Sequence, residues 1–242
     1  MADLFVGVST KAYLGYEQTL AWLAGVREVL DARPGLAERG VHAFVIPSSP
    51  LIPAARDALA ETGCWIGAQD VHWSAGATTG GVSASLLREL GVTIVEIGHA
   101  ERRTIFGETD EQIALKTAAV LDAGLVPLLC VGEASRADPV DAARVCAAQV
   151  RSAVPAGRTG DVILAYEPWW AIGAAEPADA AYVNAVVREL RVFAPRAIVY
   201  GGSAGPGTLA PLTEVDGLFL GRFAHDPANF ARVLDEALSL VE

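Results

Sequence analysis

The chain has 242 residues, of which 52% are hydrophobic and 19% are charged, and this composition excludes an intrinsically disordered protein. Its 29 Asp and Glu residues against 18 Lys and Arg give a net charge of −11, which argues against nucleic acids and anionic membranes as partners. An anionic substrate would therefore need a local positive patch.

Short β-rich runs alternate with segments of helical spacing along the whole chain. In order, the pattern predicts strand 4–8, helix 15–32, strands 41–46, 64–68 and 93–97, helix 110–124, strand 126–131, helix 140–154, strand 162–166, helix 180–193, strands 197–200 and 217–220, and helix 227–241. The runs recur without a Ser/Gly linker or a low-complexity tract between them.

This alternation indicates an α/β fold with a parallel sheet, because strands that are apolar throughout are covered on both faces. About eight strand–helix units in a chain of this length predict one domain over residues 1–242, a TIM barrel with eight parallel strands and surrounding helices. A doubly wound open sheet is the main alternative. It would place a Gly-rich phosphate loop after the first strand, and no such loop follows Val8.

Polar residues follow the predicted strands, where the active sites of such barrels lie. Helix N-termini also direct partial positive charge to that face. These residues are Lys11, Gln69, Asp70, His99, Glu101, Glu133, Glu167, Gly201 to Ser203, Gly221 and Arg222.

The cysteines and the N-terminus indicate a compartment. Cys64, Cys130 and Cys146 are odd in number and have no short motif spacing, which argues against a disulfide framework or a zinc site and fits a reducing cytoplasm. The first residues carry no basic-then-apolar leader, and no apolar run approaches the ~20 residues that span a bilayer. We therefore expect a cytoplasmic protein without membrane contact.

Four segments resemble the signature segments of the triosephosphate isomerase family. They are "VEIGHAERRTIFGETD" (95–110), "LCVGE" (129–133), "AYEPWWAIG" (165–173) and "YGGSAGPG" (200–207). The resemblance runs over nearly the whole chain, in the family's order.

The resemblance implies four catalytic residues. Glu167 would be the base that moves a proton between neighbouring carbons, and His99 would polarise the substrate carbonyl. Lys11 would supply positive charge for the enediolate and the phosphate, with Glu101 beside it. A carboxylate under an apolar cover becomes more basic, and an enediolate oxygen needs donors aimed at it, so these roles agree with the physical chemistry.

The resemblance also implies a phosphate site, a lid and a partner. Backbone N–H groups of Gly173, Ser203, Gly221 and Arg222 would bind the phosphate, and neither a metal nor an organic cofactor is required. A hydrophobic lid would exclude water, formed by Pro168, Trp169, Trp170, Ala171 and Ile172. The loop Gly76–Gly81 would join a homodimer, with Thr78 or Thr79 reaching into the partner's site.

The sequence departs from the family at positions that face the substrate. Ser9 stands where the family has Asn, Ala174 and Ala175 replace Thr-Gly in the lid, and Arg222 replaces a small residue. Gly81 replaces a Glu of the dimer loop. These changes indicate a remodelled pocket, in which the Arg222 side chain either holds phosphate or points to solvent.

We therefore expect an aldose–ketose isomerase of a small sugar phosphate. The resemblance implies dihydroxyacetone phosphate and glyceraldehyde 3-phosphate as substrates, and thus glycolysis and gluconeogenesis. One alternative is a paralogue that isomerises a four-carbon tetrulose phosphate, and another is a non-catalytic sugar-phosphate-binding barrel. A Schiff-base aldolase would need a lysine where the chain has Glu167. Glu96, inside a predicted strand, is expected to be a structural ion-pair member.

Overall fold

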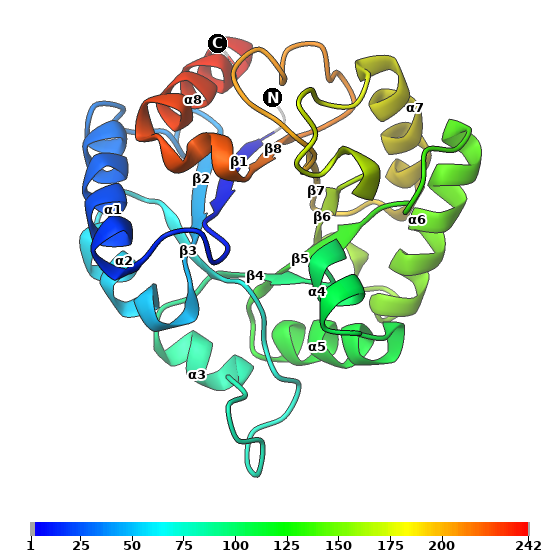
Figure 1. The fold of residues 1–242 in the computed structure, drawn as a ribbon, viewed down its shortest axis with the longest axis horizontal. Helices are drawn as coiled ribbons and strands as arrows, with labels where there is room; N and C mark the ends of the chain where they lie inside the picture. The colour runs from blue at the N-terminus through cyan, green and yellow to red at the C-terminus, as the bar shows by residue number, and fades with distance from the viewer. Residues whose placement is uncertain (1–2, 242) are drawn as a thin grey trace.

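The strands form a closed barrel in which each strand pairs in parallel with the next and the last pairs with the first (Figure 1). The computed structural model describes residues 3–241. Within these residues the barrel has eight strands: β1 Leu4–Ser9, β2 Val41–Ile46, β3 Trp65–Ala68, β4 Ile94–Ile97, β5 Val126–Val131, β6 Ile163–Tyr166, β7 Ala197–Tyr200 and β8 Gly217–Leu220. The predicted TIM barrel is confirmed.

Helices surround the barrel, as the view down its axis shows (Figure 1). They are α1 Tyr16–Asp31, α2 Ile52–Ala58, α3 Ala84–Glu89, α4 Ala100–Ile105, α5 Asp110–Asp122, α6 Pro139–Ala153, α7 Ala180–Leu190 and α8 Pro227–Val241. Short 3-10 turns are η1 Ser49–Leu51, η2 Thr159–Asp161, η3 Trp169–Ala171, η4 Arg191–Phe193 and η5 Arg222–His225. No helix in the described range is long and apolar enough to cross a membrane.

The core has two layers, separated by the barrel wall. Alternate strand residues point inward and form an apolar cluster, which includes Phe44, Leu128 and Phe219. The other strand residues pack against the helices in a larger cluster. Gly7 in β1 makes room for this interior, because a Cβ there would lie 1.9 Å from the Phe44 ring.

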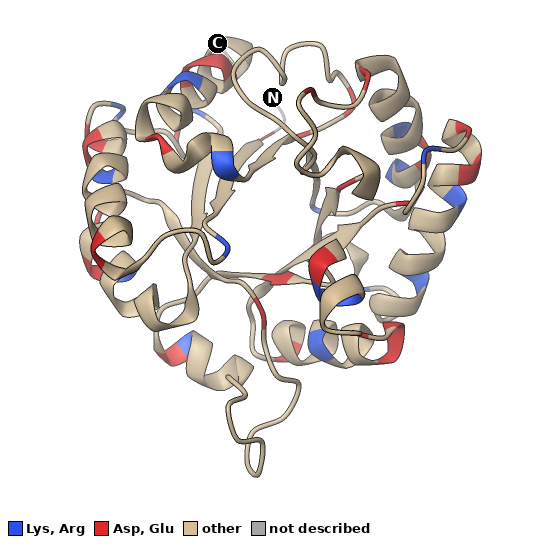
Figure 2. Cartoon of the chain, in the orientation of Figure 1, with Lys and Arg blue, Asp and Glu red and all other residues tan. Residues whose placement is uncertain are grey.

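Side-chain caps fix where several helices begin. Thr109 and Gln112 form a capping box at α5, and Asp138 caps α6 directly before Pro139. Asp179 accepts the N–H of Tyr182 at the start of α7. Charged residues of both signs are spread over the outer helices (Figure 2). The five predicted helices are confirmed as α1, α5, α6, α7 and α8, whereas the short helices α2, α3 and α4 were not predicted.

Candidate active site

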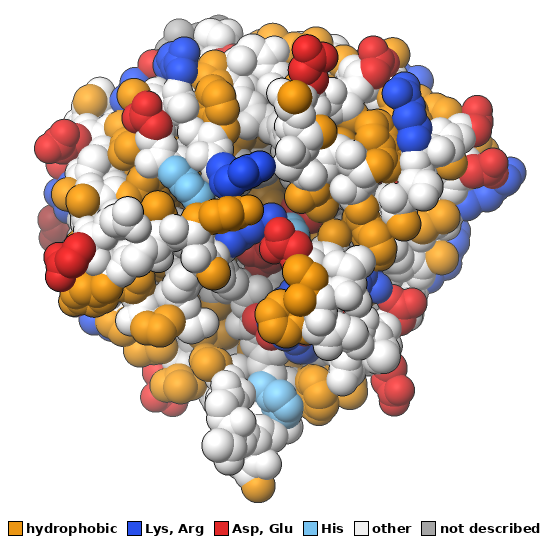
Figure 3. All heavy atoms as spheres, viewed as in Figure 1, with side chains coloured by type: hydrophobic (Ala, Val, Ile, Leu, Met, Phe, Trp, Pro, Cys, Tyr) orange, Lys and Arg blue, Asp and Glu red, His pale blue; other side chains and the backbone are white. Residues whose placement is uncertain are grey.

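A cavity of about 640 Å³ opens at the carboxyl ends of the strands. This volume lies within the range of small-molecule sites, roughly 300–1,000 Å³. Basic and acidic side chains gather around the hollow on this face (Figure 3). Ten residues predicted for the site line the cavity: Ser9, Lys11, His99, Glu101, Glu167, Ile172, Gly173, Ser203, Gly221 and Arg222.

Lys11 lies just after β1 in a left-handed backbone conformation, with φ of 47°. Such a conformation costs a non-glycine residue about 1–3 kcal/mol and persists only where neighbours enforce it. Here the Lys11 carbonyl accepts hydrogen bonds from Ser48 Oγ at 2.8 Å and from Gln69 Nε2 at 2.9 Å. The strained turn therefore directs the ammonium group into the cavity.

The Lys11 ammonium is paired with a carboxylate. Its Nζ donates to Glu101 Oε1 at 2.7 Å. Burial alone lowers the pKa of Lys11, but the hydrogen bond and charge of Glu101 outweigh it, so the pKa is raised. Lys11 thus stays charged, and the charges of Glu167 and Glu96 raise its pKa further.

His99 is the N-cap of α4, and this position fixes its tautomer. Its Nδ1 accepts the backbone N–H of Glu101 at 3.0 Å, so the proton of a neutral ring lies on Nε2. Burial, with the positive charge of Lys11, lowers the pKa of His99 to about 4. The imidazole is therefore a neutral donor at neutral pH.

Glu167 follows β6 and is almost fully buried, at 2% exposed. Its Oε2 lies 3.5 Å from His99 Nε2 and, among the described residues, has no hydrogen-bond partner. Burial and the nearby charge of Glu96 raise the pKa of Glu167 well above its ordinary value. A Cβ at Gly201 would lie 2.5 Å from the Glu167 carboxyl, so this glycine permits the close approach of β7.

Glu96 differs from its predicted role. Within residues 3–241 it makes no ion pair, and its Oε2 instead accepts the hydroxyl of Ser9 at 3.0 Å. The expectation of a structural ion pair was wrong because barrel closure brings β4 opposite the end of β1, where a serine lies. Burial raises the pKa of Glu96 to about 7.

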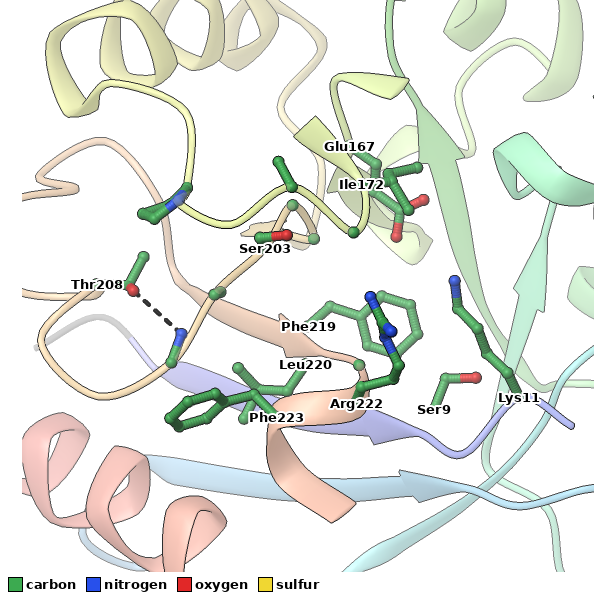
Figure 4. A pocket seen from close by; sticks show the side chains of 18 of the residues that line it. Ser9, Lys11, Glu167, Ile172, Ser203, Thr208, Phe219, Leu220, Arg222 and Phe223 are labelled. Carbon is green, nitrogen blue, oxygen red and sulfur yellow. Dashed lines mark hydrogen bonds between the residues drawn. The ribbon is translucent and has the colours of Figure 1, made fainter. Parts of the chain in front are cut away.

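The loops after β6, β7 and β8 form the opposite wall of the cavity. Gly173, Ser203, Gly221 and Arg222 all lie there. Arg222 extends from the start of η5 into the pocket, on the same side as Lys11 (Figure 4). A side chain at Gly173 would lie 3.5 Å from the Arg222 guanidinium. The guanidinium therefore reaches the tip of the predicted lid, with the ring of Tyr13 stacked beneath it.

Of the predicted lid residues, Ile172 lines the cavity, whereas Pro168 to Ala171 anchor the segment from outside it. Trp170 Nε1 donates to Glu133 Oε1 at 2.7 Å, and the same oxygen accepts the Tyr182 hydroxyl at 2.8 Å. The Ala171 carbonyl accepts the Ser203 N–H at 3.3 Å. The lid is thus held on both sides.

Several contributors were not assigned a role from the sequence. Glu133 was noted after the fifth strand, but its function as the lid anchor depends on Tyr182, 49 residues later. Tyr13 and Phe223 line the cavity mouth as exposed aromatic residues. In the sequence, each of these aromatic residues lies next to or near a cationic residue at a strand end. That pattern is too common in proteins to identify a binding residue.

In the part of the chain that the structure describes, no group of three or more His, Cys, Asp or Glu residues could hold a metal ion. The pocket offers instead a buried carboxylate, a neutral imidazole and two cations. This set suits proton transfer next to a carbonyl and recognition of an anionic group.

Comparisons with known proteins agree on one family. A family model described as triosephosphate isomerase matches residues 4–237. An L-erythrulose-1-phosphate isomerase of Pectobacterium atrosepticum is 48% identical, over 98% of this chain and 96% of that protein. One of Rhizobium meliloti with the same name is 38% identical, over 96% of each chain.

A solved structure is similar across the whole fold. The crystal structure of triosephosphate isomerase from Bartonella henselae superposes with a TM-score of 0.82 and 27% identity, and it covers 96% of this chain and 98% of that one.

The names of the curated relatives, L-erythrulose-1-phosphate isomerase, favour the four-carbon alternative over the triose phosphate expectation. Glycolysis and gluconeogenesis are not confirmed.

Proposed function

This chain belongs to the triosephosphate isomerase family and is a sugar phosphate isomerase, and we propose that its substrate is L-erythrulose 1-phosphate. The observation that supports the proposal best is the unpartnered Glu167 Oε2, buried 3.5 Å from the neutral His99 in a cavity that also contains Lys11. The relatives' names supply the four-carbon substrate.

The substrate's chemistry defines the reaction. In L-erythrulose 1-phosphate the carbonyl is C2, and the oxygen on C1 is esterified with phosphate. An enediolate with a free oxygen on each carbon can therefore form only between C2 and C3. A base removes the C3 proton, and the electrons of the C3–H bond form the C2=C3 double bond. A proton is then returned to C2, and the proton of the C3 hydroxyl passes to the C2 oxygen, which leaves the carbonyl on C3. The product is a ketose with the carbonyl one carbon farther from the phosphate.

Glu167 would take the proton from C3 and return it to C2. Its burial supports this role, because a dry carboxylate with a raised pKa is a stronger base than one in water. His99 would donate from Nε2 to the oxygen on which charge develops, and Lys11 would balance that charge. Glu101 would orient Lys11 through the 2.7 Å hydrogen bond. No step needs a metal or an organic cofactor.

The phosphate would lie against the loops after β6, β7 and β8. Backbone N–H groups of Gly173, Gly221 and Arg222 would bind it, joined by the Ser203 N–H once that group leaves the Ala171 carbonyl. The Arg222 guanidinium would add a charged, forked contact. This local positive group supports binding of an anion by a chain whose net charge is −11.

A homodimer is part of the same proposal. The loop 76–81 projects from the barrel between β3 and α3 (Figure 1). Its base and Phe106, which is 66% exposed, border a second cavity of about 420 Å³. A projecting loop beside a cavity is self-complementary, since two copies related by a two-fold axis could exchange loops. Thr78 or Thr79 would reach the partner's site.

Steady-state kinetics test the substrate. We expect the protein to isomerise L-erythrulose 1-phosphate with a kcat/KM at least about 100-fold above that for dihydroxyacetone phosphate. Glu167→Asp, which withdraws the carboxylate, should lose about 100-fold or more on the preferred substrate. Greater turnover of dihydroxyacetone phosphate would instead identify a triosephosphate isomerase, and no turnover of either by the wild type would refute both.

A further inference from the structure

The proposed substrate carries a group that a triose phosphate lacks, and the inference below rests on that proposed function. Dihydroxyacetone phosphate presents a CH2OH carbon next to its carbonyl. L-erythrulose 1-phosphate presents a CH(OH) carbon that also carries a terminal CH2OH. The pocket must therefore hold an extra hydroxymethyl group on the carbon that loses its proton, at the end of the molecule away from the phosphate.

That end of the substrate points to the floor of the cavity. The proposed phosphate donors Gly173, Gly221 and Arg222 all lie beyond the strand ends, and the Arg222 guanidinium extends from the start of η5 to the tip of the predicted lid at Gly173. Ser9 is instead the last residue of β1, and it lines the same cavity. In Figure 4, Ser9 lies near the bases of Lys11 and Arg222, away from the lid residue Ile172. A substrate held by its phosphate at the loops directs its other end toward Ser9.

The floor beside Phe219 carries a buried polar pair. Ser9 and Glu96 are 2% and 4% exposed, and the Ser9 hydroxyl donates to Glu96 Oε2 at 3.0 Å. The hydroxyl proton is thus committed to the carboxyl. The lone pairs of Ser9 Oγ are left to accept a hydrogen bond from a ligand.

We propose that Ser9, oriented by Glu96, is the specificity-determining residue that accepts a hydrogen bond from the terminal hydroxyl of a four-carbon ketose phosphate. The short serine side chain leaves room for the additional carbon. The neighbouring floor residue Phe219 is apolar and could not pair that hydroxyl. A buried hydroxyl without a partner is disfavoured, so the serine selects the substrate that supplies one.

Glu96 acts here as a positioning residue. It is buried in β4 opposite Leu128 of β5, and a carboxyl in such a position is costly unless it is hydrogen-bonded. The bond to Ser9 offsets part of that cost and fixes the serine rotamer. A serine without this partner could turn its proton toward the ligand and would no longer be a fixed acceptor.

The test is the ratio of kcat/KM on L-erythrulose 1-phosphate to that on dihydroxyacetone phosphate. Ser9→Ala should lower the ratio about 10-fold, because one hydrogen bond to the substrate is lost. Ser9→Asn, which restores the family residue, should lower it about 100-fold by filling the space. Glu96→Leu should lower the ratio as well.

Thr10→Val is the matched control, because it removes the adjacent buried hydroxyl, which does not line the cavity. It should leave the ratio unchanged. An unchanged ratio in Ser9→Ala, with the wild type active on L-erythrulose 1-phosphate, would overturn this inference and leave the proposed function standing. A wild type inactive on that substrate would overturn both. Should Ser9→Asn fail to fold by circular dichroism, Ser9→Ala alone decides.

Discussion

Glu167, the proposed base, is a carboxyl whose pKa is raised by its surroundings. Burial removes the water that would stabilise its charge, and the Glu96 carboxyl adds a second negative group nearby. Lys11 acts in the opposite direction and lowers the pKa of Glu167. The protonation of Glu167 therefore depends on its burial and on the opposing charges of Glu96 and Lys11. Of these two neighbours, Glu96 can be replaced without changing a proposed reacting group.

Glu96→Gln should shift the pH profile. The base must be ionised to act, so a raised pKa moves the acid limb of kcat/KM to higher pH. Removing the Glu96 charge lowers the pKa of Glu167, and the acid limb should move about one unit toward lower pH. The measurement compares both proteins on the same substrate, so that ionisation of the substrate phosphate is common to both. Superimposable profiles would mean that the Glu96 charge does not reach Glu167.

At this scale the motifs predicted which polar residues meet, but not how they are tuned. "GHAERR" and "AYEPWWAIG" pointed to His99 and Glu167, and both line the cavity. The hydrogen bond between Ser9 and Glu96 joins residues 87 positions apart. Its existence depends on how the closed barrel places β1 against β4, which no local pattern contains.

Long periodic elements were predictable, and short ones were not. Helix α5 was predicted from its apolar spacing, and the capping box of Thr109 and Gln112 fixes its start. Helices α3 and α4 have six residues each, fewer than two turns, so they show too little periodicity. Strand β1 extends one residue beyond the predicted end, and that residue, Ser9, faces the cavity.

The lid is an element whose position depends on one buried acceptor. Glu133 accepts hydrogen bonds from Trp170 and Tyr182, and Arg136 lies 5.3 Å above the Trp170 ring. These contacts hold η3 against α7. The proposed function of this lid is to keep water away from an enediolate whose phosphate could otherwise leave.

Trp170→Phe should loosen the lid, because it keeps an aromatic side chain but removes the indole N–H that donates to Glu133. A hydrogen bond to a charged group is worth about 1.5–3 kcal/mol, so kcat/KM should fall about 10-fold or more. Inorganic phosphate released per turnover should rise, as measured by a coupled phosphate assay. Trp65→Phe, at the start of β3, is the control and should match the wild type. Unchanged phosphate release in Trp170→Phe would contradict the role of the anchor.

The net charge of the whole molecule is opposite in sign to the cationic side chains that line its proposed substrate site. The chain carries a net charge of −11, yet Lys11 and Arg222 both line the substrate cavity. Figure 3 shows basic side chains beside acidic ones around this hollow. A local cationic site inside an acidic protein attracts a small anion without attracting polyanions.

The proposed homodimer has a direct test. Thr79→Arg places an unpaired charge in the loop 76–81 and should weaken association at least about 100-fold. Sedimentation velocity should show twice the chain mass for the wild type and a shift toward the monomer for the variant. Val192→Arg adds the same charge at a position that is 79% exposed, outside the loop, and should remain dimeric. A wild type that sediments as a monomer would refute the dimer.

The position of deuterium after reaction in D2O shows directly which carbons lose and gain the proton that Glu167 is proposed to move. L-erythrulose 1-phosphate is incubated with the protein, and the recovered substrate and product are examined by proton and carbon NMR. We expect deuterium on C3 of the recovered substrate and, in the product, on the carbon that was C2 of the substrate, with C1 unlabelled and exchange lost in Glu167→Asp. Deuterium on C1, or exchange with dihydroxyacetone phosphate but not with the tetrulose phosphate, would contradict this expectation.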